Sequence, residues 1–166
     1  MSENPNSQRP FDILLVEDNE GDVWLTKRAF QKLPVPIEFH VAGDGVEALK
    51  FLRRETPHPV APRPDLILLD LNMPRMDGRQ LLVELKRDED LKIIPVIVLS
   101  TSSADHDVRD AYRAHASAYL TKPLYFPEFA HRTQCFVDFW LSDVALLPSE
   151  NRRAEYADSP STIVKL

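Results

Sequence analysis

The chain has 166 residues and 43% hydrophobic residues, which suffice for one domain with a real core, while a net charge of −6 argues against nucleic acid as a main partner. Its single cysteine, Cys135, excludes an internal disulfide and a cysteine-based metal site. Residues 1–10 form a polar leader without a signal-peptide core, and no apolar run approaches the roughly 20 residues of a membrane span, so we expect a soluble, cytoplasmic protein.

After this leader, strands and helices alternate in the first half of the chain. A strand is expected at 11–16, followed by a helix at 22–32 whose apolar residues recur at helical spacing. Residues 37–41 form a second expected strand, and a helix reaching about Arg54 follows the turn at 43–45. Four prolines between Glu55 and Pro64 exclude a helix or a central strand there and indicate a stiff surface loop.

The second half continues the same alternation. The segments 66–70 and 96–99 are strongly apolar apart from Asp70 at the end of the first, which is typical of central strands buried on both faces. Helices are expected around 81–85, around 108–112 and at 127–141, and a short strand at 118–120. We therefore expect an α/β domain over 11–147, a flavodoxin-like (βα)5 sandwich with a parallel sheet in the order 2-1-3-4-5.

Polar residues stand at four strand ends, where ligands bind in open α/β sheets. These residues are Glu17, Asp18, Asp70, Ser100 and Lys122. Each could be an ordinary loop residue, and Ser100 a helix cap, but their joint occurrence at one edge favours a site. Three neighbouring carboxylates repel one another, and Mg²⁺, which prefers oxygen ligands, would relieve this repulsion with Asp18, Asp70 and one backbone carbonyl.

Five segments resemble the receiver domain of two-component response regulators. Their order and spacing match that family over about residues 11–141. The segments are Ile13–Asp18, Asp65–Asp70, Met73–Gly78, Pro95–Ser100 and Tyr119–Pro123.

The resemblance implies a role for each matching residue. Asp70 would accept a phosphoryl group from a sensor histidine kinase, and Mg²⁺ would be bound by Asp18, Asp70, the backbone carbonyl of Asn72 and, through water, Glu17. Lys122 would contact the phosphoryl oxygens, and Pro123 would follow it through a cis bond.

Two further positions match the family's switch. Phosphorylation adds nearly two negative charges, so Ser100 would move to donate to the phosphoryl group and Tyr119 would turn inward. Pro74 and Gly78 would shape the loop that follows Asp70. Glu17 and Ser100 stand where Asp and Thr are commoner in the family, and both preserve the chemistry.

Residues 148–166 are too few for a DNA-binding domain, so we expect a stand-alone receiver that signals by protein contact. This tail is either disordered or an arm that folds on a partner. Aromatic residues crowd the last helix beyond one core-facing stripe, which suggests a homodimer through the fourth and fifth helices. The expected interface residues are Phe136, Val137, Phe139 and Trp140.

The long proline-rich loop, the Asp22-Val23 helix start and the Phe139-Trp140-Leu141 ending resemble receivers that pair with bacterial phytochromes, the red-light-sensing histidine kinases. Rival functions are a haloacid-dehalogenase-like phosphatase, a degenerate receiver acting as a scaffold, and a flavodoxin-like cofactor binder. The phosphatase needs a second Asp where Asn72 stands, and the acidic loop at 17–21 would repel a cofactor's phosphate.

Overall fold

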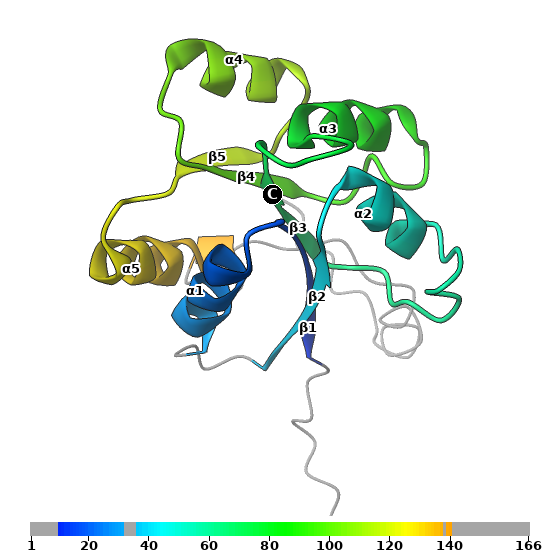
Figure 1. The fold of residues 1–166 in the computed structure, drawn as a ribbon, viewed down its shortest axis with the longest axis horizontal. Coiled ribbons are helices and arrows are strands. Elements are labelled where there is room, and N and C mark those ends of the chain that lie inside the picture. The colour runs from blue at the N-terminus through cyan, green and yellow to red at the C-terminus, as the bar shows by residue number, and fades with distance from the viewer. Residues whose placement is uncertain (1–9, 32–35, 138, 141–166) are drawn as a thin grey trace, which may run out of the picture.

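The computed structural model describes residues 10–31, 36–137 and 139–140, and in them a five-stranded parallel sheet with five helices (Figure 1). The leader before Pro10 and the tail 148–166 lie outside the described residues. The strands are β1 (Phe11–Val16), β2 (Ile37–Ala42), β3 (Leu66–Asp70), β4 (Val96–Ser100) and β5 (Ala118–Thr121). The helices are α1 (Glu20–Phe30), α2 (Gly45–Leu52), α3 (Gly78–Arg87), α4 (Asp105–Arg113) and α5 (Phe126–Val137).

The strand order is β2-β1-β3-β4-β5, which confirms the predicted flavodoxin-like sheet. All four neighbouring pairs are parallel, and Val16 of β1 pairs with Leu69 of β3. Because β1 is followed along the chain by β2 on one side and, after a crossover, by β3 on the other, the order reverses between β1 and β3. The carboxyl ends of these two strands therefore flank the crevice that such sheets use for ligands.

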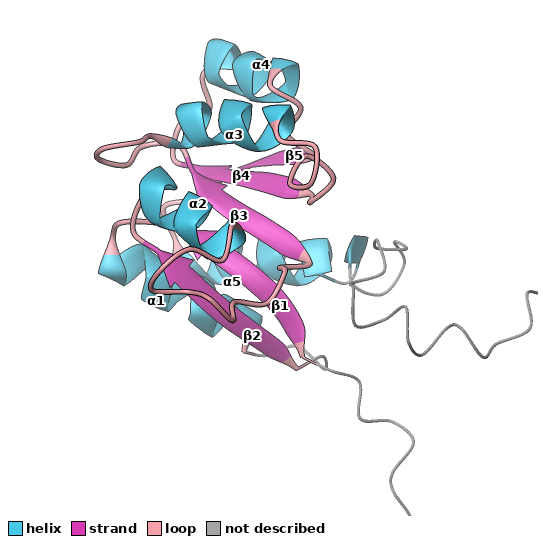
Figure 2. Ribbon diagram, turned by 90° about the vertical axis from the view of Figure 1, so that its right-hand side faces the viewer, coloured by secondary structure: helices cyan, strands magenta, loops and turns pink. Residues whose placement is uncertain are grey.

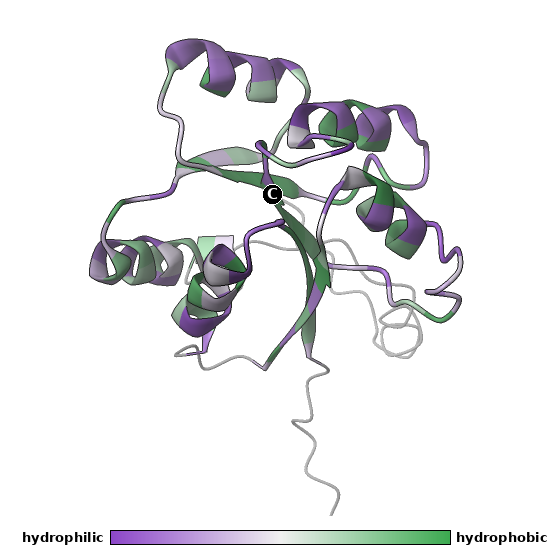
Figure 3. Cartoon of the chain, in the orientation of Figure 1, coloured by the Kyte–Doolittle hydropathy of each residue, from purple (hydrophilic) through white to green (hydrophobic). Residues whose placement is uncertain are grey.

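Helices cover both faces of the sheet, with α1 and α5 side by side on one face and α2, α3 and α4 on the other (Figures 1 and 2). Each face has its own buried cluster. Leu14, Ile67 and Leu82 belong to the first, beneath α2 and α3, and Ile13, Leu68 and Phe30 to the second, beneath α1. The central strands are hydrophobic and the helices are polar on their outer sides (Figure 3), as the alternation of apolar and polar positions predicts.

Helix starts differ from the sequence-based expectation where a side chain caps the first turn. Helix α1 begins at Glu20, not at Asp22, because the Asn19 side chain accepts a hydrogen bond from the Asp22 amide. Helix α3 begins at Gly78 after a capping box, in which Asp77 and Gln80 each bind the other's backbone N–H. These caps satisfy amide groups that a helix leaves unpaired at its amino end.

Most other element boundaries agree with the sequence-based expectation to within a few residues, while the expected ends of the last helix at Leu141 and of the domain at residue 147 lie outside the described residues. Strands β4 and β5 extend to Ser100 and Thr121, and residues 55–64 contain neither helix nor strand. Among the described residues, no helix has both the length and the apolar character needed to cross a membrane.

Candidate functional site

Three carboxylates meet at the crevice between β1 and β3. Glu17 and Asp18 follow β1 directly, and Asp70 is the last residue of β3. One oxygen from each of the three lies within 4.8 Å of the others. The sequence predicted this meeting because parallel strands place their carboxyl ends at the same edge of the sheet.

Two of these carboxyl groups are removed from water. Glu17 is 3% exposed and Asp70 is 8% exposed, whereas Asp18 is exposed. Burial raises the pKa of Asp70, against the opposing effects of Lys122 and of backbone hydrogen bonds at Asn72 and Leu71. The charge of Asp18 raises the same pKa further. The site therefore holds negative charge that its protein surroundings only partly neutralise.

Lys122 supplies the positive charge of the site from the loop after β5. Its Nζ lies 2.5 Å from Glu17 Oε2 and 3.0 Å from Asp22 Oδ2. Burial still raises the pKa of Glu17, because desolvation outweighs the contribution of this ion pair. The pKa of Lys122 is itself raised: desolvation lowers it, but the hydrogen bonds that the ammonium donates to Glu17 and Asp22 and the negative charges of Asp70 and Glu17 together outweigh desolvation. The ammonium thus stays protonated at neutral pH and lies within electrostatic reach of Asp70.

Asp22 is a member of this cluster that the sequence analysis did not assign to it. It lies in the first turn of α1, one helical turn after Asp18, and its N–H is bound by the Asn19 cap. The signal available in the sequence was an acidic residue in the first turn of a helix that starts at the predicted site. That signal has an ordinary explanation, since acidic residues favour helix amino ends.

The donor set suits a hard divalent cation. Glu17, Asp18 and Asp70 supply carboxylate oxygens, which Mg²⁺ and similar ions prefer. Burial raises the pKa of both Glu17 and Asp70, and a bound cation would favour their ionised forms. The described residues contain no other such group of three metal-ligating side chains. Ligation of the cation by the backbone carbonyl of Asn72 stays a prediction. The backbone N–H of the same residue forms a hydrogen bond with the Asp70 carboxylate.

The loop after Asp70 is fixed by a close approach of backbone to backbone. The Gly78 N–H donates to the Leu71 carbonyl at 3.0 Å, at the start of α3. A Cβ at Gly78 would lie 2.1 Å from the Asp70 carbonyl oxygen, which no real contact allows. This close approach supports the structural role expected for Gly78, which stays a prediction like that of Pro74, a residue exposed in the same loop.

Ser100 and Tyr119 lie on neighbouring strands and meet at the backbone of Ser102. Ser100 is fully buried, and its Oγ accepts a hydrogen bond from the Ser102 N–H at 3.2 Å. Tyr119 packs against the first cluster, and its hydroxyl donates to the Ser102 carbonyl at 2.8 Å. The phenol ring is therefore already partly buried beside the loop that follows Ser100.

One expectation at the site is wrong. The cis peptide bond found among the described residues is Thr56–Pro57, so the bond between Lys122 and Pro123 is not cis. The sequence could not decide this, because the two isomers of an X–Pro bond differ by only about 0.5–1 kcal/mol.

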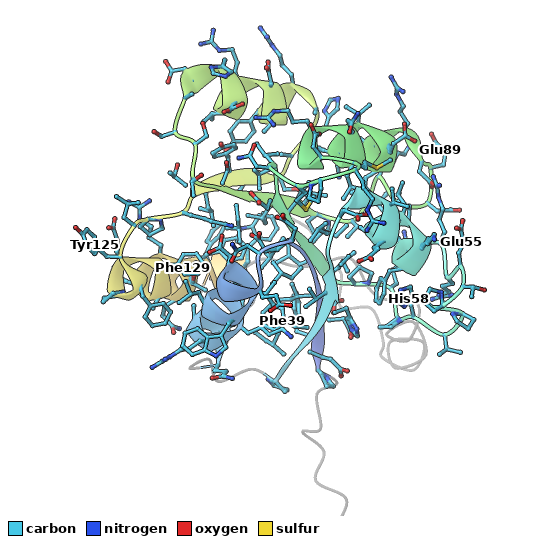
Figure 4. The ribbon with its side chains drawn as sticks, viewed as in Figure 1. Phe39, Glu55, His58, Glu89, Tyr125 and Phe129 are labelled. Carbon is cyan, nitrogen blue, oxygen red and sulfur yellow. The ribbon has the colours of Figure 1, made fainter. Side chains whose placement is uncertain are left out.

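A cavity of about 210 Å³ lies beside Lys122, between α1 and the start of α5. Asp22, Thr101 and Lys122 are among its polar lining residues, and Phe126 and Phe129 among its apolar ones. Figure 4 shows Phe129 on α5 near α1, and Tyr125 in the loop just before α5.

The residues expected at a dimer interface do not form one exposed patch. Phe136 is buried in the second cluster, so its assignment to an exposed interface is wrong: the ring packs on the sheet beneath α5. Trp140 packs against the same cluster and against Phe136, with ring centroids 5.7 Å apart. Phe139 is 57% exposed, and the side chain of Val137 lies outside the described residues. Helical spacing alone did not reveal which aromatic residues the core would take up.

Comparison with known proteins gives a consistent result. Residues 13–134 match the model of the response regulator receiver domain. Response regulator Rcp1 from Synechocystis is 41% identical over 140 residues, which cover 84% of this chain and 95% of the relative. The probable methanogenesis regulatory protein FilR2 from Methanothrix harundinacea is also 41% identical, covering 81% of this chain and 86% of that protein.

Solved structures agree with the sequence matches. The phosphorylated cyanobacterial phytochrome response regulator RcpA aligns with a TM-score of 0.79 and 43% identity, covering 83% of this chain and 99% of that one. The Mn²⁺-bound form of Rcp1 aligns with a TM-score of 0.78 and 40% identity, with the same coverage.

Proposed function

Because the chain belongs to the response regulator receiver domain family, and therefore acts as a phosphorelay receiver with a sensor histidine kinase, we propose that Asp70 is the residue that accepts the phosphoryl group. The observation that carries this proposal is the cluster of Glu17, Asp18 and Asp70 at the crevice, with the buried Lys122 beside it. Asp70 is the carboxylate of the three at the end of the central strand.

In the phosphoryl transfer, the only covalent change in the protein is at the Asp70 carboxylate. A carboxylate oxygen of Asp70 forms a P–O bond as the P–N bond of a phosphohistidine breaks, and the leaving imidazole takes up a proton. Such reactions depend mainly on positioning and on neutralising the phosphoryl oxygens. The Gly78 backbone contact fixes Asp70, and Lys122, held by Glu17 and Asp22, supplies a positive charge next to it.

We propose Mg²⁺ as the divalent cation that the receiver uses. Glu17, Asp18, Asp70 and the Asn72 carbonyl would hold it, directly or through water. When bound, it would neutralise the carboxylates and the phosphoryl oxygens. Titration of the protein with Mg²⁺, followed by calorimetry, tests this assignment independently of phosphorylation, and Asp18→Asn should weaken that binding.

The test of the acceptor is intact mass after incubation with acetyl phosphate. We expect the wild type to gain one phosphoryl group with Mg²⁺ and none with EDTA, and Asp70→Asn to gain none. Labelling of Asp70→Asn equal to that of the wild type would refute Asp70 as the acceptor. Receivers are signalling proteins and not enzymes with external substrates, and Asn72 stands where the rival phosphatase would need its acid/base.

The partner kinase is a finer question, for which we propose a phytochrome. In support, RcpA is a cyanobacterial phytochrome response regulator, although FilR2, at similar identity to this chain, is named for methanogenesis. Phosphotransfer from a purified phytochrome kinase should be much faster than from an unrelated histidine kinase. Faster transfer from the unrelated kinase would contradict the assignment.

A homodimer through α4 and α5 stays a prediction, as does the cytoplasmic location. Tyr112 on α4 is 51% exposed, and Phe139 after α5 is exposed. We expect light scattering at micromolar concentration to give twice the monomer mass for the wild type, with or without a phosphoryl analogue. A monomer under both conditions would refute the dimer.

A further inference from the structure

The loop between β4 and α4 is anchored by a network that the transfer chemistry does not use. Its central residue is Ser102, two residues after Ser100. The Ser102 N–H donates to Ser100 Oγ, and its carbonyl accepts from the Tyr119 hydroxyl. Its own hydroxyl donates to Asp107 Oδ2 at 2.6 Å. Ser102 therefore connects both residues of the expected switch to helix α4.

Asp107 connects this loop in turn to helix α3. Its second oxygen, Oδ1, lies 2.5 Å from an Arg79 guanidinium nitrogen and 3.6 Å from His106 Nε2. The Asp107 side chain is 12% exposed, and the hydrogen bonds from Ser102 and Arg79 lower its pKa, so it is ionised at neutral pH. One carboxylate thus ties the first turn of α4 to Ser102 on one side and to the first turn of α3 on the other.

The position of Tyr119 indicates which state of the expected switch this network stabilises. In the expected switch, the ring turns inward when Asp70 is phosphorylated. In the structure Tyr119 already packs on the first cluster, with its hydroxyl bound to Ser102 and the Arg79 charge within reach of the phenol. The bonds to Ser102 therefore support the inward position, and an outward ring would give up its bond to the Ser102 carbonyl.

We propose that Asp107 and Arg79 are positioning residues, which hold Ser102 so that the loop after Ser100 and the inward Tyr119 are preset for a phosphorylated Asp70. This inference rests on the proposed function, and it adds that α3 and α4 bias the response before any phosphoryl group arrives. An interaction made in only one of two states shifts the equilibrium between them, and the affinity for a ligand of that state shifts by the same factor.

The test is the affinity for beryllofluoride, a phosphoryl analogue, measured by calorimetry with saturating Mg²⁺. We expect Arg79→Gln and Asp107→Asn each to weaken beryllofluoride binding by about threefold, the range of a partly exposed ion pair. The double variant Arg79→Gln with Asp107→Asn should weaken binding by no more than the larger single effect, because both residues act through the same link to Ser102. Asp110→Asn is the matched control, since Asp110 pairs with the exposed Arg113 on the same helix and should change nothing.

The possible results distinguish a failure of the positioning role from a failure of the proposed function. Unchanged or tighter binding in both single variants, or losses that simply add in the double variant, would overturn the positioning role. Absence of beryllofluoride binding in a folded, Mg²⁺-binding wild type would overturn the proposed function and the inference with it. Amide hydrogen exchange at 102–104 gives a second readout, which should be faster in the single variants and unchanged in Asp110→Asn.

Discussion

Replacing Gly78 by alanine should disable the site without touching any of its charged groups. The added Cβ would lie 2.1 Å from the Asp70 carbonyl oxygen, 2.7 Å from Leu71 Cα and 2.9 Å from the Asp70 carbonyl carbon. All three neighbours are backbone atoms, so no side chain can rotate away. Either the start of α3 or the end of β3 must move, and β3 is held between β1 and β4.

The size of the effect follows from that displacement. A non-bonded contact between carbon and oxygen needs more than 3 Å, so the two segments must separate by roughly 1 Å. Overpacking of this kind costs about 1–3 kcal/mol of stability. A misplacement of roughly 1 Å at a reacting group can slow a reaction about 100-fold. We therefore expect a folded, destabilised protein whose labelling by acetyl phosphate is slower by at least about tenfold.

Urea denaturation and the rate of labelling by intact mass measure the two effects. Gly43→Ala is the matched control, because a Cβ there would meet only the flexible end of Glu47, at 3.3 Å. It should keep wild-type stability within about 0.5 kcal/mol and label at the wild-type rate. Wild-type stability and labelling in Gly78→Ala would refute the reasoning from backbone contact.

Further predictions concern charge and capping. Because burial raises the pKa of Asp70, the folded metal-free protein binds a proton that the unfolded chain has released, so stability should fall as pH rises from about 3.8 to the raised value. In urea denaturation repeated over a series of pH values, Asp70→Asn should show a smaller fall in stability than the wild type. Saturating Mg²⁺ should offset the fall in the wild type. Lys122→Met leaves Glu17 buried without its cation and should cost about 3 kcal/mol in urea denaturation at pH 7, and less at pH 5. Asp77→Ala breaks the capping box of α3 and should cost about 1 kcal/mol by the same method, whereas an unchanged midpoint would contradict the cap's contribution.

The sequence by itself determined the order of elements, the sheet topology and the position of the site. Two apolar segments, 66–70 and 96–99, could only be central strands, and alternation of strands and helices restricts the connections to a parallel sheet. Because the carboxyl ends of the strands in such a sheet share one edge, the polar residues at or just after these ends must lie near one another. The grouping of Glu17, Asp18 and Asp70 follows from this rule.

Only the tertiary structure decided which side chains pair and which are buried. Asp22 shares Lys122 with Glu17, and Asp107 joins α3 to the loop after Ser100, because the fold brings separate segments within hydrogen-bond distance. Likewise, Phe136 is buried while Phe139 is exposed. Periodicity fixes which residues share a face of an element, but pairing and burial depend on the neighbour that the packed fold places against that face.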